Sequence, residues 1–207
     1  LYHPESLREF KRGVDYIELR PDRAGTHDIG GPMAIIQFLS SGKERIALPA
    51  ALVCDHLVQA NVGAIPDLKV AEKGNVETYE FLRDVSRRYG FDFWPAGSGI
   101  CHQVFMENYN FPGCMMLVTD SHTPTACGMG MLAIGVGGAD LVDALMGMEW
   151  ELKMPKIIGV KLTGQLQGWA SAKDVILKLT GMLSTKGATN CVVEFFGEGA
   201  ATLSASG

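Results

Sequence analysis

The sequence predicts a layered α/β fold, in which helices flank a central, mostly parallel sheet. Short apolar runs alternate along the chain with segments of helical periodicity, and this alternation is typical of βαβ units. Polar clusters follow two of the apolar runs directly, where open α/β sheets bind their ligands. Hydrophobic residues make up 47% of the 207 residues and charged residues 20%, as in ordinary globular domains.

The first half of the chain predicts helices and strands separated by glycine and proline breaks. The clearest helix spans 75–89, where Val76, Tyr79 and Leu82 recur at helical spacing and Gly90 follows. Its charged residues fit a solvated face. The expected elements are a helix over 4–12, a strand over 16–19, a break at 21–23, a glycine-bearing turn over 25–31, a helix over 33–40 ended by Gly42, and strands over 45–53 and 91–94.

The second half predicts a strand over 115–118 and a helix over 139–148. The pattern then restarts after Met154-Pro155. A strand over 156–162, a helix over 172–183 and a strand over 191–196 form a fresh βαβ unit. We therefore expect a first α/β domain over 1–154 and the start of a second over 155–207.

Charge and cysteine usage narrow the classes of partner. The net charge is −5 and no basic cluster is longer than Arg87-Arg88, so nucleic acid and anionic membranes are poor partners. No apolar run approaches the ~18 residues of a spanning helix. The five cysteines are odd in number, widely spread and without a CxxC pair, so neither a disulfide framework nor a local zinc site is predicted.

The two ends suggest a fragment of a longer protein. The chain opens with Leu1 rather than Met, and no signal or transit sequence precedes His3. It stops at Gly207 without a closing helix or strand.

The segment Thr119–Pro124 (TDSHTP) is the strongest candidate for a site. It follows the apolar run over 115–118, and it places Asp120, Ser121 and His122 side by side at a predicted strand end. Adjacent side chains at such a turn point in different directions, so these three groups can surround one small polar ligand. Capping of the next helix explains the same residues equally well.

Two further histidines stand at comparable positions. Asp55 and His56 end the predicted strand over 45–53, and a carboxylate beside an imidazole orients a proton carrier that works near neutral pH. His102 follows a Gly-Ser-Gly turn. Alone, each fits a structural role better than a catalytic one, but three imidazoles placed by turns or strand ends together favour a site. The glycines over 128–138 lack a G-x-G-x-x-G in register, so we reject a dinucleotide site.

These motifs together resemble the N-terminal region of the aconitase family, and the resemblance runs from about Tyr16 to Gly207. It therefore implies the layered α/β/α domains of that region. The blocks that carry it are Leu19-Arg20-Pro21-Asp22-Arg23, Cys54-Asp55-His56-Leu57, Gly97-Ser98-Gly99-Ile100 with His102-Gln103, Thr119–Pro124, Gly135-Val136-Gly137-Gly138-Ala139-Asp140, and Pro155-Lys156 with Gly159–Gly164.

The resemblance implies a hydro-lyase that interconverts citrate and isocitrate through cis-aconitate. By position, Asp55 and His56 resemble the pair that handles the proton of the departing hydroxyl, and His102 looks like a second pocket histidine. Asp120 and His122 resemble groups hydrogen-bonded to an iron-bound water, and Ser121 matches a contact to a substrate carboxylate.

The family uses a [4Fe-4S] cluster whose open iron binds the substrate hydroxyl as a Lewis acid. The family's cluster cysteines match none of the five cysteines here, so no metal ligand is expected within this chain and the cluster ligands are expected C-terminal to Gly207. We therefore expect the 207 residues alone to be inactive.

Two positions depart from the mitochondrial-type pattern. His27 stands where those enzymes carry a substrate-binding Gln, so His27 joins Asp120, Ser121 and His122 as an expected substrate-binding residue. Thr125 replaces the usual Asn, as in the related isopropylmalate and homoaconitate isomerases. The alternatives are a homoaconitase-like isomerase, a cluster-free RNA-binding regulator, or an inactive product.

The remaining expectations follow from the resemblance. The expected partner is a small tricarboxylic acid, without membrane or nucleic acid, and the full-length protein is expected to be a monomer. The expected location is the mitochondrial matrix, or the cytoplasm for a bacterial protein.

Overall fold

The computed structural model describes residues 10–184 and 186–204. Its contacts divide the described residues into two compact units: Leu19–Trp150 forms one, and residues 10–18 group with the described residues from Glu151 onward in the other. This division differs from the expected domains in placing the N-terminal residues with the C-terminal part. The boundary near residue 154 stays a prediction, and the predicted helix over 4–12 lies mostly outside the described residues.

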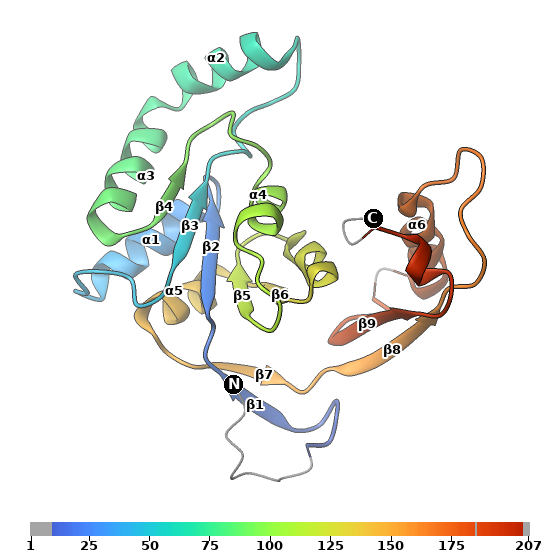
Figure 1. Ribbon diagram of the computed structural model, residues 1–207. Helices are drawn as coiled ribbons and strands as arrows, with labels where there is room; N and C mark the ends of the chain where they lie inside the picture. The colour runs from blue at the N-terminus through green and yellow to red at the C-terminus, as the bar shows by residue number, and fades with distance from the viewer. Residues whose placement is uncertain (1–9, 185, 205–207) are drawn as a thin grey trace. The chain divides into compact units, whose positions relative to one another are not determined.

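A five-stranded parallel sheet forms the centre of the larger unit (Figure 1). Its order is β4-β3-β2-β5-β6, so the chain starts at β2, builds outward to β4, and then crosses to β5 on the other side of β2. The strand order thus reverses at β2, which makes the carboxyl end of β2 a topological switch point. The strands are β2 (Arg23–His27), β3 (Ala50–Val53), β4 (Asp92–Trp94), β5 (Met115–Val118) and β6 (Leu132–Gly135).

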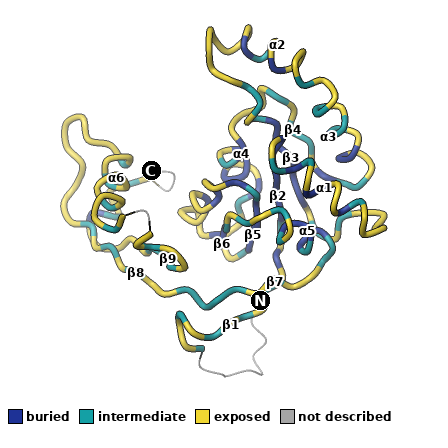
Figure 2. The backbone as a smooth tube through the Cα atoms, turned by 180° about the vertical axis from the view of Figure 1, so that it is seen from behind, coloured by how far each residue is buried: buried dark blue, intermediate teal, exposed yellow. Residues whose placement is uncertain are grey.

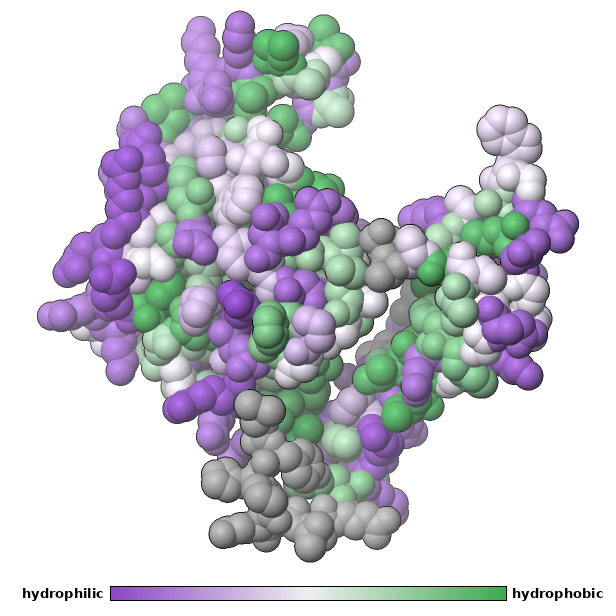
Figure 3. Space-filling view, in the orientation of Figure 1, coloured by the Kyte–Doolittle hydropathy of each residue, from purple (hydrophilic) through white to green (hydrophobic). Residues whose placement is uncertain are grey.

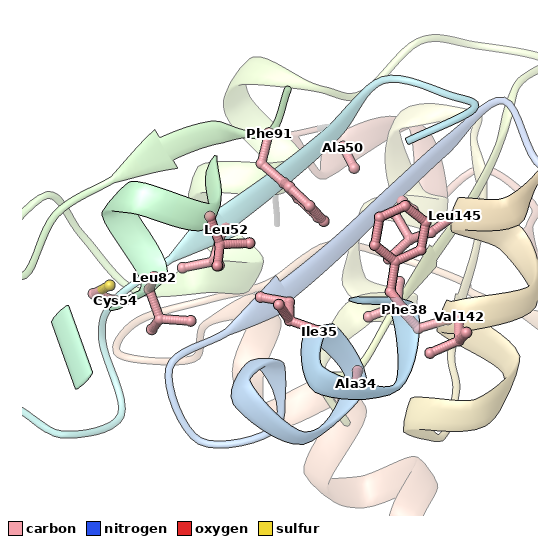
Figure 4. Packing of buried hydrophobic residues seen from close by; sticks show 13 residues of the cluster. Ala34, Ile35, Phe38, Ala50, Leu52, Cys54, Leu82, Phe91, Val142 and Leu145 are labelled. Carbon is pink, nitrogen blue, oxygen red and sulfur yellow. The ribbon is translucent and has the colours of Figure 1, made fainter. Parts of the chain in front are cut away.

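Helices cover both faces of this sheet, which confirms the predicted α/β class. Alternate residues of β3 separate the faces: Ala50 and Leu52 join a cluster with α1, α3 and α5, and Ala51 and Val53 join a cluster with α4. Figure 4 shows the first cluster, and Figure 2 shows the buried strands between the more exposed helices. The helices are α1 (Gly31–Ser40), α3 (Val76–Tyr89), α4 (Cys101–Asn108) and α5 (Gly138–Met146).

The clearest predicted helix is confirmed as α3. Leu82 and Val85 are buried from its apolar stripe. Gly90 ends the helix in the left-handed conformation, with φ of 95°, which glycine adopts at little cost.

The prediction was wrong at β2, the central strand. Residues 21–31 read as a break and a turn, but Arg23–His27 pairs with β3 on one side and β5 on the other. Its small residues Ala24 and Gly25 carry no β signal, because the strand is buried on both faces and must admit bulky neighbours. A Cβ at position 25 would overlap the ring of Phe105 on α4.

The sequence analysis missed several other elements and predicted one strand that was too long. The strand expected over 45–53 begins only at Ala50, and α4, which begins just after the Gly-Ser-Gly turn, was not predicted. The 3-10 helix η1 (Thr123–Met129) and β6 occupy the glycine-rich segment. Glycine and proline hid these elements, since both residues lower the helical and strand signals.

Helix α2 (Ala64–Gly74) was also missed, because most of its residues are exposed and it lacks a clear apolar stripe. Its apolar side chains Ile65 and Val70 are 70% and 72% exposed, and Val62, just before the helix, is 78% exposed. Figure 3 shows hydrophobic and charged residues mixed at the surface. The Asp67 carboxylate holds the start of α2 by accepting the backbone N–H groups of residues 61, 62 and 63.

The smaller unit contains the predicted βαβ pattern. Strands β8 (Lys156–Lys161) and β9 (Cys191–Phe196) pair in parallel, and α6 (Ala172–Leu183) connects them. Ser171 and Asp174 form a capping box at the start of α6. The strands β1 (Tyr16–Leu19) and β7 (Trp150–Lys153) form a separate two-stranded sheet, and a short 3-10 helix, η2 (Ala200–Thr202), follows β9.

The helices of residues 10–184 and 186–204 include none with the length and apolar character that crossing a membrane requires.

Candidate active site

The carboxyl edge of the parallel sheet gathers the residues that the sequence analysis selected. His27 ends β2, Asp55 and His56 follow β3, and Asp120 follows β5 (Figure 1). His102 lies on the first turn of α4. All these strands are parallel, so their carboxyl ends meet at one edge and bring residues far apart in sequence together.

Asp55 fixes the ring of His56 in its plane. The Asp55 Oδ1 atom lies 2.7 Å from His56 Nδ1, and Asp55 Oδ2 accepts the backbone N–H of Cys101 at 2.7 Å. The second bond places the carboxylate at the N-terminus of α4, where helix dipoles favour negative charge. A carboxylate at Nδ1 selects the tautomer that leaves Nε2 available for proton transfer.

Asp28 ties the loop after β3 to the end of β2. Its side chain is fully buried, and it accepts the backbone N–H groups of His56 at 3.0 Å and Leu57 at 3.2 Å. The His56 Nδ1 atom lies 3.9 Å away. We did not predict Asp28 as a site residue, because the segment before it did not read as a strand.

Asp120 lies among three imidazoles. Its Oδ1 atom is 3.8 Å from His56 Nε2 and 3.9 Å from His122 Nδ1, and its Oδ2 atom is 3.7 Å from His102 Nδ1. These separations are longer than hydrogen bonds. The Asp120 side chain is only 3% exposed, and its Oδ2 accepts the His122 backbone N–H at 2.8 Å.

The imidazoles differ in exposure. The side chain of His122 is 66% exposed, that of His56 33% and that of His102 21%. The rings of His102 and His122 lie 4.9 Å apart. Ser121 Oγ is 3.3 Å from His122 Nδ1, so the hydroxyl and the imidazole lie together at the surface of the site.

A cavity of about 460 Å³ opens on the β6 side of this cluster; Asp120 and Ser121 lie in its wall, but none of the four imidazoles does. A volume of this size suits a small organic ligand. Gly135 allows β6 to pack closely against the backbone at Asp120, because a Cβ at position 135 would lie 2.7 Å from the Asp120 carbonyl oxygen. A second cavity of about 300 Å³, lined by Arg20, Ala47 and Gly147 among others, contains none of the predicted site residues.

His27 is buried and already bonded at both ring nitrogens. Its Nε2 lies 2.9 Å from the Thr119 carbonyl oxygen, and Nδ1 accepts the backbone N–H groups of Ile29 and Gly30 at 3.3 and 3.4 Å. Burial lowers the pKa of His27, and repulsion from His56 lowers it further. The ring stacks on that of His56 at 3.8 Å.

Two cysteines of the described residues, Cys54 and Cys101, are buried near the site. Burial raises the pKa of Cys54 to about 12 and also raises the pKa of Cys101, so both remain protonated thiols. Three groups of metal-type ligands lie within 4.8 Å, and none contains two cysteines. These groups are His27, Asp28 and His56; Asp55, His56 and Cys101; and Cys101, His102 and Asp120.

The nitrogens of His27 are occupied by the backbone, and burial and the nearby Asp55 and Asp120 raise the pKa of the Cys101 thiol. The geometry places imidazoles between fixed carboxylates, an arrangement suited to moving protons.

Fold and site together define an α/β protein with a cluster of imidazoles and carboxylates at the switch point of a parallel sheet. Residues 3–207 match the Aconitase family (aconitate hydratase), and the chain belongs to that family.

The relatives include aconitate hydratases. The chain is 54% identical over 200 residues to the mitochondrial aconitate hydratases of Saccharomyces cerevisiae and Candida albicans, covering 97% of this chain and 26% of each relative. It is 52% identical over 196 residues to the mitochondrial homocitrate dehydratase of Saccharomyces cerevisiae, covering 95% of this chain and 25% of that protein. The chain thus spans about a quarter of the length of these curated relatives.

Proposed function

We propose that this chain belongs to a hydro-lyase that interconverts citrate and isocitrate through cis-aconitate. The observation that carries the proposal is the Asp55–His56 pair, joined at 2.7 Å, with His56 Nε2 facing Asp120 beside the cavity. Membership of the aconitase family and the aconitate hydratase relatives support the reaction class.

In this proposal His56 handles the proton of the departing hydroxyl. Dehydration breaks the carbon–oxygen bond, and the hydroxyl leaves as water once it receives one proton. His56 donates that proton from Nε2 while Asp55 keeps the ring oriented through Nδ1. Hydration runs the same transfer in reverse. The base that removes the carbon-bound proton is not among the residues assigned here.

The remaining proposed roles are binding and orientation. Ser121 and His122 lie at the exposed side of the site, where a hydroxyl and an imidazole suit a substrate carboxylate. His102 and Asp120 lie deeper and orient the groups around them. Among the predicted substrate-binding residues His27 has the least support, because both its nitrogens bond to the backbone.

We further propose that the [4Fe-4S] cluster of the family is held by cysteines outside these 207 residues. The mismatch between the cysteines of the described residues and a cluster site supports this assignment. On this basis the 207 residues alone are inactive. Anaerobic reconstitution of the 207-residue chain with iron and sulfide tests this, and a stable iron-sulfur absorbance with turnover would contradict it.

The test of the main proposal is a substrate panel. The protein, purified as its gene encodes it, is incubated with citrate, isocitrate, homoaconitate and isopropylmalate, and formation or loss of the unsaturated acid is followed. We expect the highest kcat/KM with citrate and isocitrate. Clear preference for another acid overturns the assignment.

The second candidate is a homoaconitase-like hydro-lyase for a longer acid. The homocitrate dehydratase at 52% identity favours it, together with His27 and Thr125 at the two departing positions. The same panel separates the candidates, since this one predicts the highest kcat/KM with homoaconitate.

We also propose that the full-length protein is located in mitochondria. We propose that it is a monomer and that its substrate is a small tricarboxylic acid. The curated relatives with mitochondrial in their names support the location. Cell fractionation tests it, and recovery outside mitochondria contradicts it.

A further inference from the structure

We propose that His27 is a positioning residue that holds the His56 ring at a fixed angle by stacking against its face. The inference rests on the proposed function only where it concerns turnover. The two rings lie 3.8 Å apart, centroid to centroid, with an angle of 19° between their planes. His56 is thus held in its plane by Asp55 and on one face by His27.

The His27 ring is itself anchored on two sides. Nε2 donates to the Thr119 carbonyl oxygen at 2.9 Å, and Nδ1 accepts the N–H groups of Ile29 and Gly30. Only one tautomer satisfies both sides, because the carbonyl can only accept and the amides can only donate. The ring is therefore locked as a neutral imidazole with its proton on Nε2.

The surroundings favour this neutral state over a charged one. His27 is 6% exposed, and burial lowers its pKa, as does repulsion from His56. The hydrogen bond to the Thr119 backbone and, after it, the carboxylates of Asp55 and Asp28 raise the pKa, but each acts more weakly. A neutral stacked partner lets His56 gain a proton without a second positive charge 3.8 Å away.

A fixed ring angle matters because His56 Nε2 must point into the pocket. The nitrogen lies 3.8 Å from Asp120 Oδ1, and rotation about the ring's attachment would move it out of line with a bound hydroxyl. Small losses of alignment in a proton donor reduce the rate more than the binding of the substrate.

The first arm of the test is structural and needs no turnover. In histidine-labelled protein, ring carbon–nitrogen correlations should show His27 as the neutral Nε2–H tautomer between about pH 6 and 8. His27→Gln identifies its signals by their loss, and it should broaden the His56 ring signals as that ring samples more than one angle. Unchanged His56 signals in His27→Gln would overturn the proposal.

Thr26→Val is the matched control for the strand ends. The Thr26 Oγ1 and Thr119 Oγ1 atoms lie 2.8 Å apart, and this hydrogen bond links β2 to the residue that follows β5. It does not involve His56. Val has nearly the same shape but cannot make this bond. We expect Thr26→Val to leave the His56 signals unchanged, and equal broadening would mean that strand linkage, not stacking, orients His56.

The second arm separates positioning from substrate binding. In the protein as its gene encodes it, His27→Gln should lower kcat about tenfold while KM changes by less than about twofold, and His27→Phe, which keeps an aromatic face, should lose less. A tenfold rise in KM at unchanged kcat would make His27 a substrate contact and overturn the proposal. If the wild-type protein turns over none of the acids tested, the proposed function fails and the spectroscopic arm alone decides the role of His27.

Discussion

Each buried carboxylate of the site accepts a backbone N–H group as well as facing an imidazole. Asp28 accepts from His56 and Leu57, Asp55 from Cys101, and Asp120 from His122. Amide donors hold a carboxylate's orientation without competing for the proton that the imidazole carries. Asp55 and Asp120 were predictable as polar residues after apolar runs, whereas Asp28 was not, since its role depends on a bond 28 residues away.

Asp55→Asn should lower kcat about 100-fold while the protein remains folded. The amide keeps the shape of the carboxylate, but it weakens the bond to His56 Nδ1 and allows the other tautomer. Steady-state kinetics measures the loss, and circular dichroism checks the fold. Asp84→Asn is the control, because its side chain is 68% exposed on α3. Equal activities of the two variants would remove Asp55 from the mechanism.

The cysteines should differ in their reaction with iodoacetamide at pH 8. Burial and nearby carboxylates raise the pKa of Cys54 to about 12, so little thiolate is present, while Cys127 is exposed. We expect Cys127 to be alkylated in the folded protein and Cys54 only after unfolding. Peptide mass spectrometry measures both rates, and rapid labelling of Cys54 in the native protein contradicts the expectation.

Among the elements, β2 shows why a central strand escapes a pattern-based prediction. Apolar periodicity found β3, β5 and α3, because their side chains fill the space between layers. In β2 the side chains are small because α4 lies directly against the strand at Gly25. A glycine adds no side chain to the apolar pattern of a strand. The close packing of β2 against α4 is therefore visible only in the three-dimensional structure, where the Phe105 ring lies against Gly25.

Gly25→Ala should destabilise the protein by about 1–3 kcal/mol, since the added methyl group overlaps the Phe105 ring and displaces α4. Thermal unfolding measures the cost. Gly74→Ala is the control, because a Cβ there meets no atom within 4 Å. The double variant with Phe105→Leu should recover part of the loss. A wild-type melting temperature for Gly25→Ala would show that the helix yields without cost.

Asp67→Ala should loosen α2, whose first turn depends on that carboxylate. Backbone N–H donors lower the pKa of Asp67, so its contribution to stability is present above the unfolded pKa and disappears as the pH falls through the folded value. We expect faster amide exchange in α2 at neutral pH, and a difference from wild type that shrinks below about pH 4. Glu72→Ala removes the same charge from the same helix, and comparable exchange in both variants would contradict the capping role.

In the whole molecule, the apolar core lies in one unit. Every buried hydrophobic residue that the structure describes falls between Ala24 and Leu145. The layered α/β class and the later βαβ pattern followed from periodicity alone. The grouping of the N-terminal residues with those after Glu151 did not, since long-range contacts of this kind leave no local signal.

Stability should therefore differ between the two parts of the 207-residue chain. Amides of β8, α6 and β9 should exchange at lower denaturant concentrations than those of β2, β3 and β5, because α6 has no buried residue and the two strands form a sheet of only two. Native-state hydrogen exchange with mass spectrometry resolves the two sets. A single shared transition would show that they unfold as one cooperative body.

The reversal of strand order at β2 also affects synthesis on the ribosome. One neighbour of β2 ends at Val53, but the other begins only at Met115, so a nascent chain keeps one edge of its central strand unpaired while some sixty residues are added. An open edge of this kind recruits other strands. Chaperone capture should therefore be strongest before β5 emerges, and the candidate site is assembled only when that edge closes.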